Sequence, residues 1–210
     1  MVKYPKLYTN GDAKKYPLII SLHGHGSNEK DLMGLASYFS EDMFWVSGRG
    51  PQTYGNNAFD WYELPPNPTK IAAILKQVNI FIGELKLKYP IDTNNVYLMG
   101  FSQGSMISLS YVIAFPNSIS GAVSQSGALP SDIGLEIDKK GLENKAIMIT
   151  HGSEDMMMPI ERGRQSGEFL KKYKADVTFK EFKMGHTINN ESITEVKKWL
   201  HLELQKPKRQ

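Results

Sequence analysis

Short apolar runs alternate along the chain with longer segments whose apolar residues recur every three or four positions. The apolar runs are typical of strands buried on both faces, and they span residues 18–22, 43–47, 95–99, 120–126, 146–150 and 177–182. The periodic segments predict helices over residues 29–40 (with Asn28 as the N-cap), 69–89, 105–115, 160–173 and 191–204. The remaining segments, 1–16, 48–68 and 128–145, predict loops. The alternation indicates right-handed βαβ units, and therefore an α/β fold with a mainly parallel central sheet and helices on both faces.

Several polar residues follow the carboxyl ends of the predicted strands. In open parallel sheets, ligands bind beyond these ends, which all lie at one edge of the sheet. His23, Ser102, Asp155 and His186 each come after a predicted strand. Four positions far apart in the sequence are therefore expected at one edge, and this edge is where we expect the functional site.

The composition is that of an ordinary globular protein. The chain has 210 residues, of which 40% are hydrophobic and 22% charged, so we expect a single domain over residues 1–210. The net charge is only +3, and part of it comes from the tail at residues 206–209, which is typical of a solvated end. We therefore expect no nucleic-acid partner.

The absence of cysteine excludes disulfides, thiolate metal sites and a cysteine nucleophile, and is compatible with a reducing cytosol. Residues 1–5 lack the apolar core of a signal peptide, and no run approaches the roughly 18 apolar residues of a membrane span. We therefore expect a soluble, cytoplasmic protein without a membrane span. No histidine–carboxylate spacing indicates a metal, no cofactor is expected, and a homodimer is left open.

The sequence Gly100-Phe101-Ser102-Gln103-Gly104 lies between a predicted strand and a predicted helix. In this context Gly-x-Ser-x-Gly indicates a nucleophile elbow, a tight turn that holds the serine hydroxyl clear of the sheet. The two glycines are needed because strand and helix nearly touch there. The alternative is a glycine-flanked turn with no chemistry, since the pentapeptide alone arises often by chance.

A serine hydroxyl needs a base, normally histidine, to accept its proton. Of the five histidines, His201 lies within the last predicted helix, and a structural role is expected for His23 and His151, which precede glycines at strand ends. His186 follows Gly185 on the loop between the last strand and the last helix. It is therefore the candidate base, the alternative being an exposed loop histidine without a function.

The base in turn needs an acid, and the intermediate needs hydrogen-bond donors for its oxyanion. Glu154 and Asp155 both lie on the loop after the strand at 146–150. One oxyanion donor is expected from the backbone N–H of Gln103, the residue after the nucleophile. For the second we predict the N–H of His25, with Gly24 as its nearest rival and no role for the His25 side chain.

At this point a resemblance to a known family covers about residues 17–190. The matching segments are Leu22-His23-Gly24-x-Gly26, Gly48-Arg49-Gly50-Pro51, Phe59-Asp60-Trp61-Tyr62-Glu63, Gly100-Phe101-Ser102-Gln103-Gly104, His151-Gly152-x-x-Asp155-x-x-x-Pro159 and Gly185-His186. They are similar to motifs of the phospholipase/carboxylesterase family of small α/β-hydrolases, which includes bacterial carboxylesterases and acyl-protein thioesterases. The resemblance implies an α/β-hydrolase fold with no separate cap domain.

The resemblance also implies a catalytic triad of Ser102, Asp155 and His186, and it favours Asp155 over Glu154 as the acid. The order serine–acid–histidine along the chain is that of α/β-hydrolases. Oxyanion donors are implied at His25 and Gln103. The sequence departs from the family pattern at Ser105, where a second glycine is common, at His25, where an apolar residue is frequent, and in the methionine-rich segment at 156–158.

For the substrate site we predict walls formed by Phe59, Trp61, Met156 and Met158, the alternative being that these side chains pack in the core.

The resulting hypothesis is a serine carboxylesterase that cleaves small-molecule esters of short- to medium-chain acids through an acyl-enzyme. One alternative is an acyl-protein thioesterase or lysophospholipase with a long acyl groove. Another is a non-catalytic ligand-binding module. A dinucleotide-binding domain lacks its glycine fingerprint here, and a dienelactone hydrolase of the usual type would need a cysteine.

Overall fold

The computed structural model describes residues 1–11, 13–130, 134 and 137–207. The strands are β1 (Val2–Lys3), β2 (Tyr16–Leu22), β3 (Phe44–Gly48), β4 (Gln52–Gly55), β5 (Ala58–Asp60), β6 (Ile91–Phe101), β7 (Gly121–Gln125), β8 (Ala146–Gly152) and β9 (Asp176–Phe182). The α-helices are α1 (Pro68–Lys88), α2 (Gln103–Ala114), α3 (Lys139–Leu142), α4 (Ile160–Lys172) and α5 (Asn190–Gln205). Two 3₁₀ helices, η1 (Leu32–Tyr38) and η2 (Pro116–Ser118), complete the elements of the described ranges.

The main sheet has the strand order β1-β3-β2-β6-β7-β8-β9. Only β1 is antiparallel to its neighbour, and every other pairing in this sheet is parallel. The chain builds outward from β2 to β3, returns through α1, and then builds in the opposite direction from β6 to β9. The strand order therefore reverses between β2 and β6, which is the place where open α/β sheets bind their ligands.

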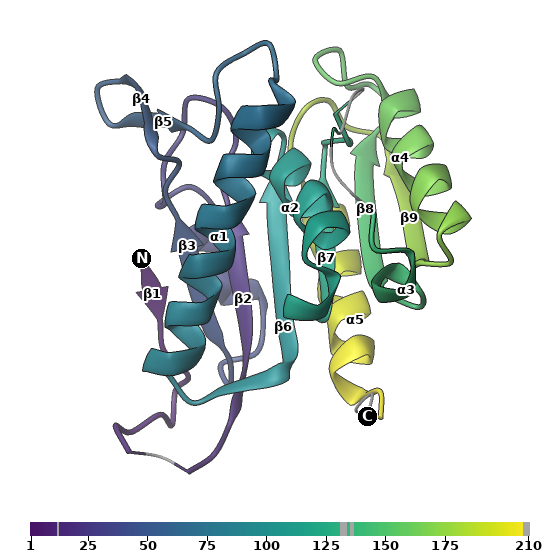
Figure 1. The fold of residues 1–210 in the computed structure, drawn as a ribbon. Helices are drawn as coiled ribbons and strands as arrows, with labels where there is room; N and C mark the ends of the chain where they lie inside the picture. The colour runs from purple at the N-terminus through teal and green to yellow at the C-terminus, as the bar shows by residue number, and fades with distance from the viewer. Residues whose placement is uncertain (12, 131–133, 135–136, 208–210) are drawn as a thin grey trace.

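Helices cover both faces of the sheet (Figure 1). On one face, α1, α2 and α4 bury a large apolar core that includes Ile74, Leu109 and Leu170. On the other face, η1 and α5 bury a smaller core that includes Phe39 and Val196. The expected α/β fold with a mainly parallel sheet and helices on both faces is confirmed.

The helix expected at residues 29–40 is wrong, because only a 3₁₀ helix, η1, forms there. The Asn28 side chain accepts from the N–H of Lys30, two residues on, and so closes a turn instead of capping an α-helix. Gly34 lies in the middle of the segment, and the Ser37 hydroxyl donates to its carbonyl at 2.9 Å. A glycine and a serine bonded to the backbone three residues earlier both favour a short, tight helix over a regular one.

The expected loops contain more structure than their composition suggested. Within residues 48–68, β4 and β5 form an antiparallel hairpin, and Asn57 in its turn has φ of 58°. Gly-Asn-Asn between two short strands is a turn signal that could have predicted it. Residues 2–3 form β1, and α3 falls within the loop expected at 128–145, part of which lies outside the described residues.

The junction of β6 and α2 depends on two glycines. Ser102, between them, has φ of 50° and ψ of −112°, a left-handed conformation that costs energy in any residue but glycine. A Cβ on Gly100 would overlap the backbone of Gly104, and a Cβ on Gly104 would overlap the carbonyl oxygen of Leu22 at the end of β2. The start of α2 therefore rests directly on β2, and no side chain fits between them.

Gly104→Ala is expected to lower the free energy of unfolding by about 2 kcal/mol or more, because the backbone of β2 or α2 must shift to admit the methyl group. Gly83→Ala is the matched control, since Gly83 lies on α1 with open space around its Cα and alanine is the better helix former. Urea unfolding followed by circular dichroism measures both. Equal stability of the two variants would contradict the tight contact at Gly104.

Candidate active site

Three loops at the carboxyl edge of the sheet bring Ser102, His186 and Asp155 into one hydrogen-bonded chain. Ser102 Oγ lies 2.8 Å from His186 Nε2, and His186 Nδ1 lies 2.7 Å from Asp155 Oδ2. The three residues follow β6, β9 and β8. The Asp155 side chain is fully buried, whereas the His186 ring keeps a small exposed area. This is the arrangement in which a carboxylate orients an imidazole that can accept the serine proton.

The Ser102 turn is held by hydrogen bonds to the neighbouring strand. The Ser102 N–H donates to the carbonyl of Gln125 on β7 at 3.0 Å. The Ser105 Oγ accepts from the Gln125 N–H at 2.8 Å and lies 2.6 Å from the Gly100 carbonyl, to which it can donate. Ser105, which departs from the family pattern, lies at the start of α2 and thus links this helix to Gly100 on β6 and to Gln125 on β7.

Both carboxylate oxygens of Asp155 accept hydrogen bonds from the protein. Its Oδ1 accepts from the backbone N–H groups of Met157 and Met158 at 3.0 and 2.8 Å, which leaves Oδ2 for His186. The buried His151 contributes indirectly, because its Nε2 donates to the Met158 carbonyl at 2.7 Å and lies 3.5 Å from Asp155 Oδ2. The side chain of the rival acid Glu154 is exposed, and its backbone N–H donates to the Met184 carbonyl at 3.1 Å.

The loop after β2 lies against the serine. A Cβ on Gly24 would come within 3.5 Å of Ser102 Cβ and 3.0 Å of the Phe101 ring, which also packs on the His186 ring at 5.1 Å between centroids. Neither the His25 nor the Gln103 backbone N–H has an acceptor among residues 1–11, 13–130, 134 and 137–207. Gln103 is the first residue of α2, where N–H groups are free and the helix dipole is positive.

His23 ties this loop to the segment around Gly50. Its Nε2 accepts from the Gly50 N–H at 2.9 Å, and its Nδ1 donates to the Gly24 carbonyl at 2.7 Å. Burial lowers the pKa of His23, which keeps the ring neutral as these two bonds require. The His23 carbonyl accepts from Trp61 Nε1 at 2.9 Å. The structural role expected for His23 therefore consists of holding the loop that carries His25.

The hydrogen bonds of two side chains in this region were not predicted from the sequence. The Gln103 side chain bridges the loop after β5, accepting from the Trp61 N–H at 2.7 Å and donating to the Tyr62 carbonyl at 2.8 Å. Asp60, the last residue of β5, accepts from the Gly26 N–H at 2.7 Å. The sequence feature that could have indicated these contacts is the family-like segment at 59–63, in which the acidic Asp60 lies among aromatic residues.

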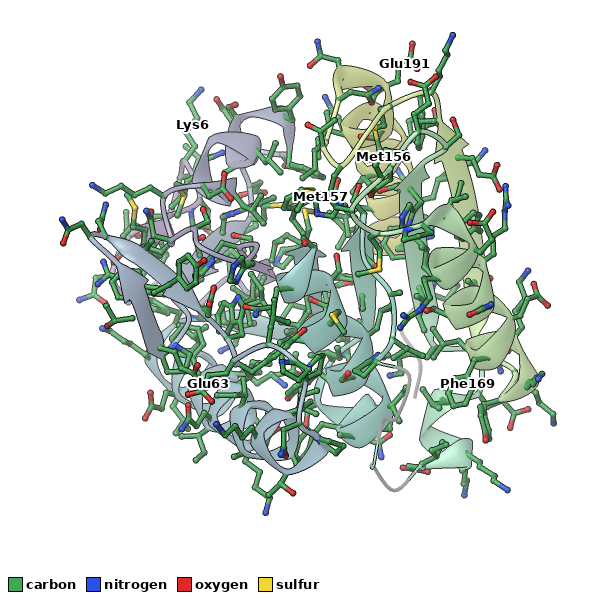
Figure 2. All side chains as sticks on the ribbon, turned by 90° about the horizontal axis from the view of Figure 1, so that it is seen from above. Lys6, Glu63, Met156, Met157, Phe169 and Glu191 are labelled. Carbon is green, nitrogen blue, oxygen red and sulfur yellow. The ribbon has the colours of Figure 1, made fainter. Side chains whose placement is uncertain are left out.

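The residues predicted as substrate walls lie in different surroundings. Trp61 is in the main core, and Phe59 lies half-buried beneath the Arg49 guanidinium at 4.5 Å. Met158 is partly buried, whereas Met156 is 93% exposed on the loop beside the acid. Seen from above, onto the carboxyl ends of the strands, Met156 and its exposed neighbour Met157 mark this loop (Figure 2). A substrate role for these side chains stays a prediction.

In the part of the chain that the structure describes, no three histidine, aspartate or glutamate side chains come together to hold a metal ion. None of the helices there is both long and apolar enough to cross a membrane.

The parallel sheet with its strand–turn–helix serine and the hydrogen-bonded histidine and aspartate define the class of an α/β-hydrolase, and comparison with known proteins agrees. The chain belongs to the phospholipase/carboxylesterase family, whose profile matches residues 7–204. It is therefore a serine hydrolase of esters by class, as the motifs in the sequence had indicated.

Individual relatives are distant but span most of the chain. Carboxylesterase SOBER1 of Arabidopsis thaliana is 27% identical over 87% of this chain and 88% of its own length. Acyl-protein thioesterase 1 of Kluyveromyces lactis is 27% identical over 69% of this chain and 66% of its own. Among solved structures, the Bacillus cereus carboxylesterase superposes with a TM-score of 0.84 at 24% identity, covering 97% of this chain and 93% of its own, which shows a shared fold.

Arg49 forms an ion pair with Glu29 next to Phe59, one of the predicted wall residues. Its guanidinium donates two hydrogen bonds of 2.5 Å to the carboxylate of Glu29 and lies over the Phe59 ring. The hydrogen bonds from Arg49 lower the pKa of Glu29 from 4.5 to about 2. Because the folded state thus holds the ionised carboxylate more strongly than the unfolded chain does, the pair stabilises the fold fully above about pH 4.5. This contribution is lost as the pH falls toward 2.

Glu29→Gln is therefore expected to make the free energy of unfolding less dependent on pH between 4.5 and 2 than in the wild type, while both proteins keep their fold at pH 7. Urea midpoints measured at half-unit pH steps give the two slopes. Glu84→Gln is the control for an exposed carboxylate on α1, and its curve should run parallel to that of the wild type. Parallel curves for wild type and Glu29→Gln would contradict the pairing.

Proposed function

We propose that the protein hydrolyses carboxylic esters of short- to medium-chain acids through an acyl-enzyme on Ser102. His186 Nε2 takes the hydroxyl proton as Oγ attacks the ester carbonyl. The tetrahedral oxyanion receives hydrogen bonds from the backbone N–H groups of Gln103 and His25. As it collapses, His186 returns the proton to the departing alcohol, which leaves the acyl group on Ser102. His186 then activates a water molecule, and its attack releases the acid and restores the serine.

The observation that carries this proposal is the unbroken hydrogen-bond chain from Ser102 Oγ through His186 to Asp155, with distances of 2.8 and 2.7 Å. A serine in a turn without chemistry would not need a left-handed backbone and a buried carboxylate aligned behind its histidine. The two N–H groups without acceptors beside it supply the donors that acyl transfer needs.

The acyl length is inferred from the walls of the site. Trp61 packs in the core and lines a small apolar pocket, and Phe59 is covered by Arg49, so the segment that carries them is tied down. Met156 and Met157 offer flexible apolar contact at the edge of the site. This arrangement favours a small acyl group held close to Ser102.

A second candidate is hydrolysis of long-chain thioesters or lysophospholipids by the same residues. The observation in its favour is the pair of exposed methionines, an apolar surface along which a longer chain could lie. One relative of the chain, from Kluyveromyces lactis, is named acyl-protein thioesterase 1. The two candidates share their chemistry and differ in the chain length they prefer.

Hydrolysis of p-nitrophenyl esters from acetate to palmitate tests both candidates. We expect kcat/KM to be highest between acetate and octanoate, and Ser102→Ala to lower kcat by about 10⁴-fold or more because the nucleophile is gone. Asp155→Asn should lower kcat by about 10³- to 10⁴-fold, because the amide cannot hold the histidine in its working tautomer.

Ser153→Ala is the matched control, since this exposed serine lies two residues before Asp155 and donates only to the Phe182 carbonyl. Its activity should equal that of the wild type. An optimum at palmitate would favour the thioesterase or lysophospholipase. Turnover by Ser102→Ala at the wild-type rate would reject the acyl-enzyme on Ser102, and a wild type that turns over no ester would favour the non-catalytic binding module.

A further inference from the structure

The loop that carries His25 has little conformational restraint of its own. His25 stands between Gly24 and Gly26, and Gly26 has φ of 66°. Glycine leaves the backbone free to rotate, so the direction of the His25 N–H must be fixed by contacts from outside the loop. A donor that is aimed before the reaction begins stabilises the transition state far more than one that must be ordered during it.

Asp60 provides such contacts on both residues at once. Its Oδ1 accepts from the Gly26 N–H at 2.7 Å and lies 2.8 Å from His25 Nδ1. Asp60 is only 5% exposed, so these bonds face little competition from water. The His25 ring also packs edge-on against Tyr54 at 4.4 Å between centroids. The residue whose N–H we assign to the oxyanion is thus held through its own side chain and through the next peptide.

The segment that carries Asp60 is itself attached to the second donor. The side-chain amide of Gln103 bonds the N–H of Trp61 and the carbonyl of Tyr62, while Trp61 Nε1 bonds the carbonyl of His23. Residues 60–62 therefore connect the loop after β2 with the first residue of α2. The two expected oxyanion donors lie on different elements, and this segment joins them.

We propose that Asp60 is a positioning residue that aims the His25 N–H at the oxyanion, with the His25 imidazole as the partner through which it does so. This inference rests on the proposed ester hydrolysis and adds a residue that touches neither the substrate nor the catalytic side chains. An apolar side chain at position 25 would leave Asp60 bonded only to Gly26. The bond from the His25 side chain to Asp60 therefore restrains a backbone segment that the flanking glycines leave free to rotate.

The test is the separate measurement of kcat and KM on p-nitrophenyl butyrate. Asp60→Ala should lower kcat about 10- to 100-fold and change KM less than about threefold, because the oxyanion contact exists only in the transition state. Asp60→Asn should recover most of the lost kcat, since its amide oxygen still accepts from Gly26. His25→Leu should lower kcat by about three- to tenfold, because the Gly26 contact remains.

Asp31→Ala is the matched control, as its carboxylate accepts from the hydroxyl of Ser27 on the outer side of the same loop. It should keep the wild-type kcat. A second readout is the Kd of butylboronic acid, which adds to a serine as a tetrahedral, oxyanion-like adduct. Asp60→Ala should raise this Kd in proportion to its loss of kcat, and a purely structural role would not produce that match.

The inference is overturned if Asp60→Ala and His25→Leu retain the wild-type kcat and boronate affinity, or if Asp31→Ala loses as much kcat as they do. Should Asp60→Ala fail to fold, His25→Leu decides the question by the same criteria. A wild type that turns over no ester shows instead that the proposed function has failed, and the positioning role falls with it. An active wild type with unaffected Asp60 variants removes the positioning role alone.

Discussion

The contact between Gly104 and the end of β2 is the constraint on which the rest of the site depends. Because no atom larger than hydrogen fits there, α2 begins directly against the last residues of β2. This contact places Ser102, the free N–H of Gln103 and the loop after β2 at one point. It also coincides with the reversal of strand order between β2 and β6. The left-handed serine is thus the result of a packing requirement and at the same time the means of exposing its hydroxyl.

The sequence predicted the parts of the site that topology determines. Residues that follow parallel strands must meet at one edge, so Ser102, Asp155 and His186 could be grouped before any coordinates were known. The resemblance to a family then decided between Glu154 and Asp155. Periodicity likewise found the long strands and helices, because it reports directly on burial. It failed at residues 29–40, where Gly34 and the hydrogen bond from the Ser37 hydroxyl to its carbonyl accompany a 3₁₀ helix instead of an α-helix.

The parts that the sequence did not predict are contacts between segments distant in the chain. Asp60 binds residues 34 or more positions away, and the residues next to it in the sequence do not indicate those partners. From the sequence, Gln103 is expected to contribute only its backbone N–H, although its side-chain amide also ties the start of α2 to Trp61 and Tyr62. The substrate role of the wall residues stays a prediction, since Trp61 both packs in the core and lines a small apolar pocket.

The position of β9 at the edge of the sheet has a consequence for how activity and stability are related. Among the strands of the described residues, β9 pairs only with β8. His186 follows β9, whereas Ser102 follows β6 in the interior of the sheet. Edge strands open more readily than interior strands, since fewer contacts hold them. A local opening at this edge moves His186 away from Ser102 while the central strands stay paired. The enzyme can therefore lose its activity in an otherwise folded state, and recover it when the edge closes.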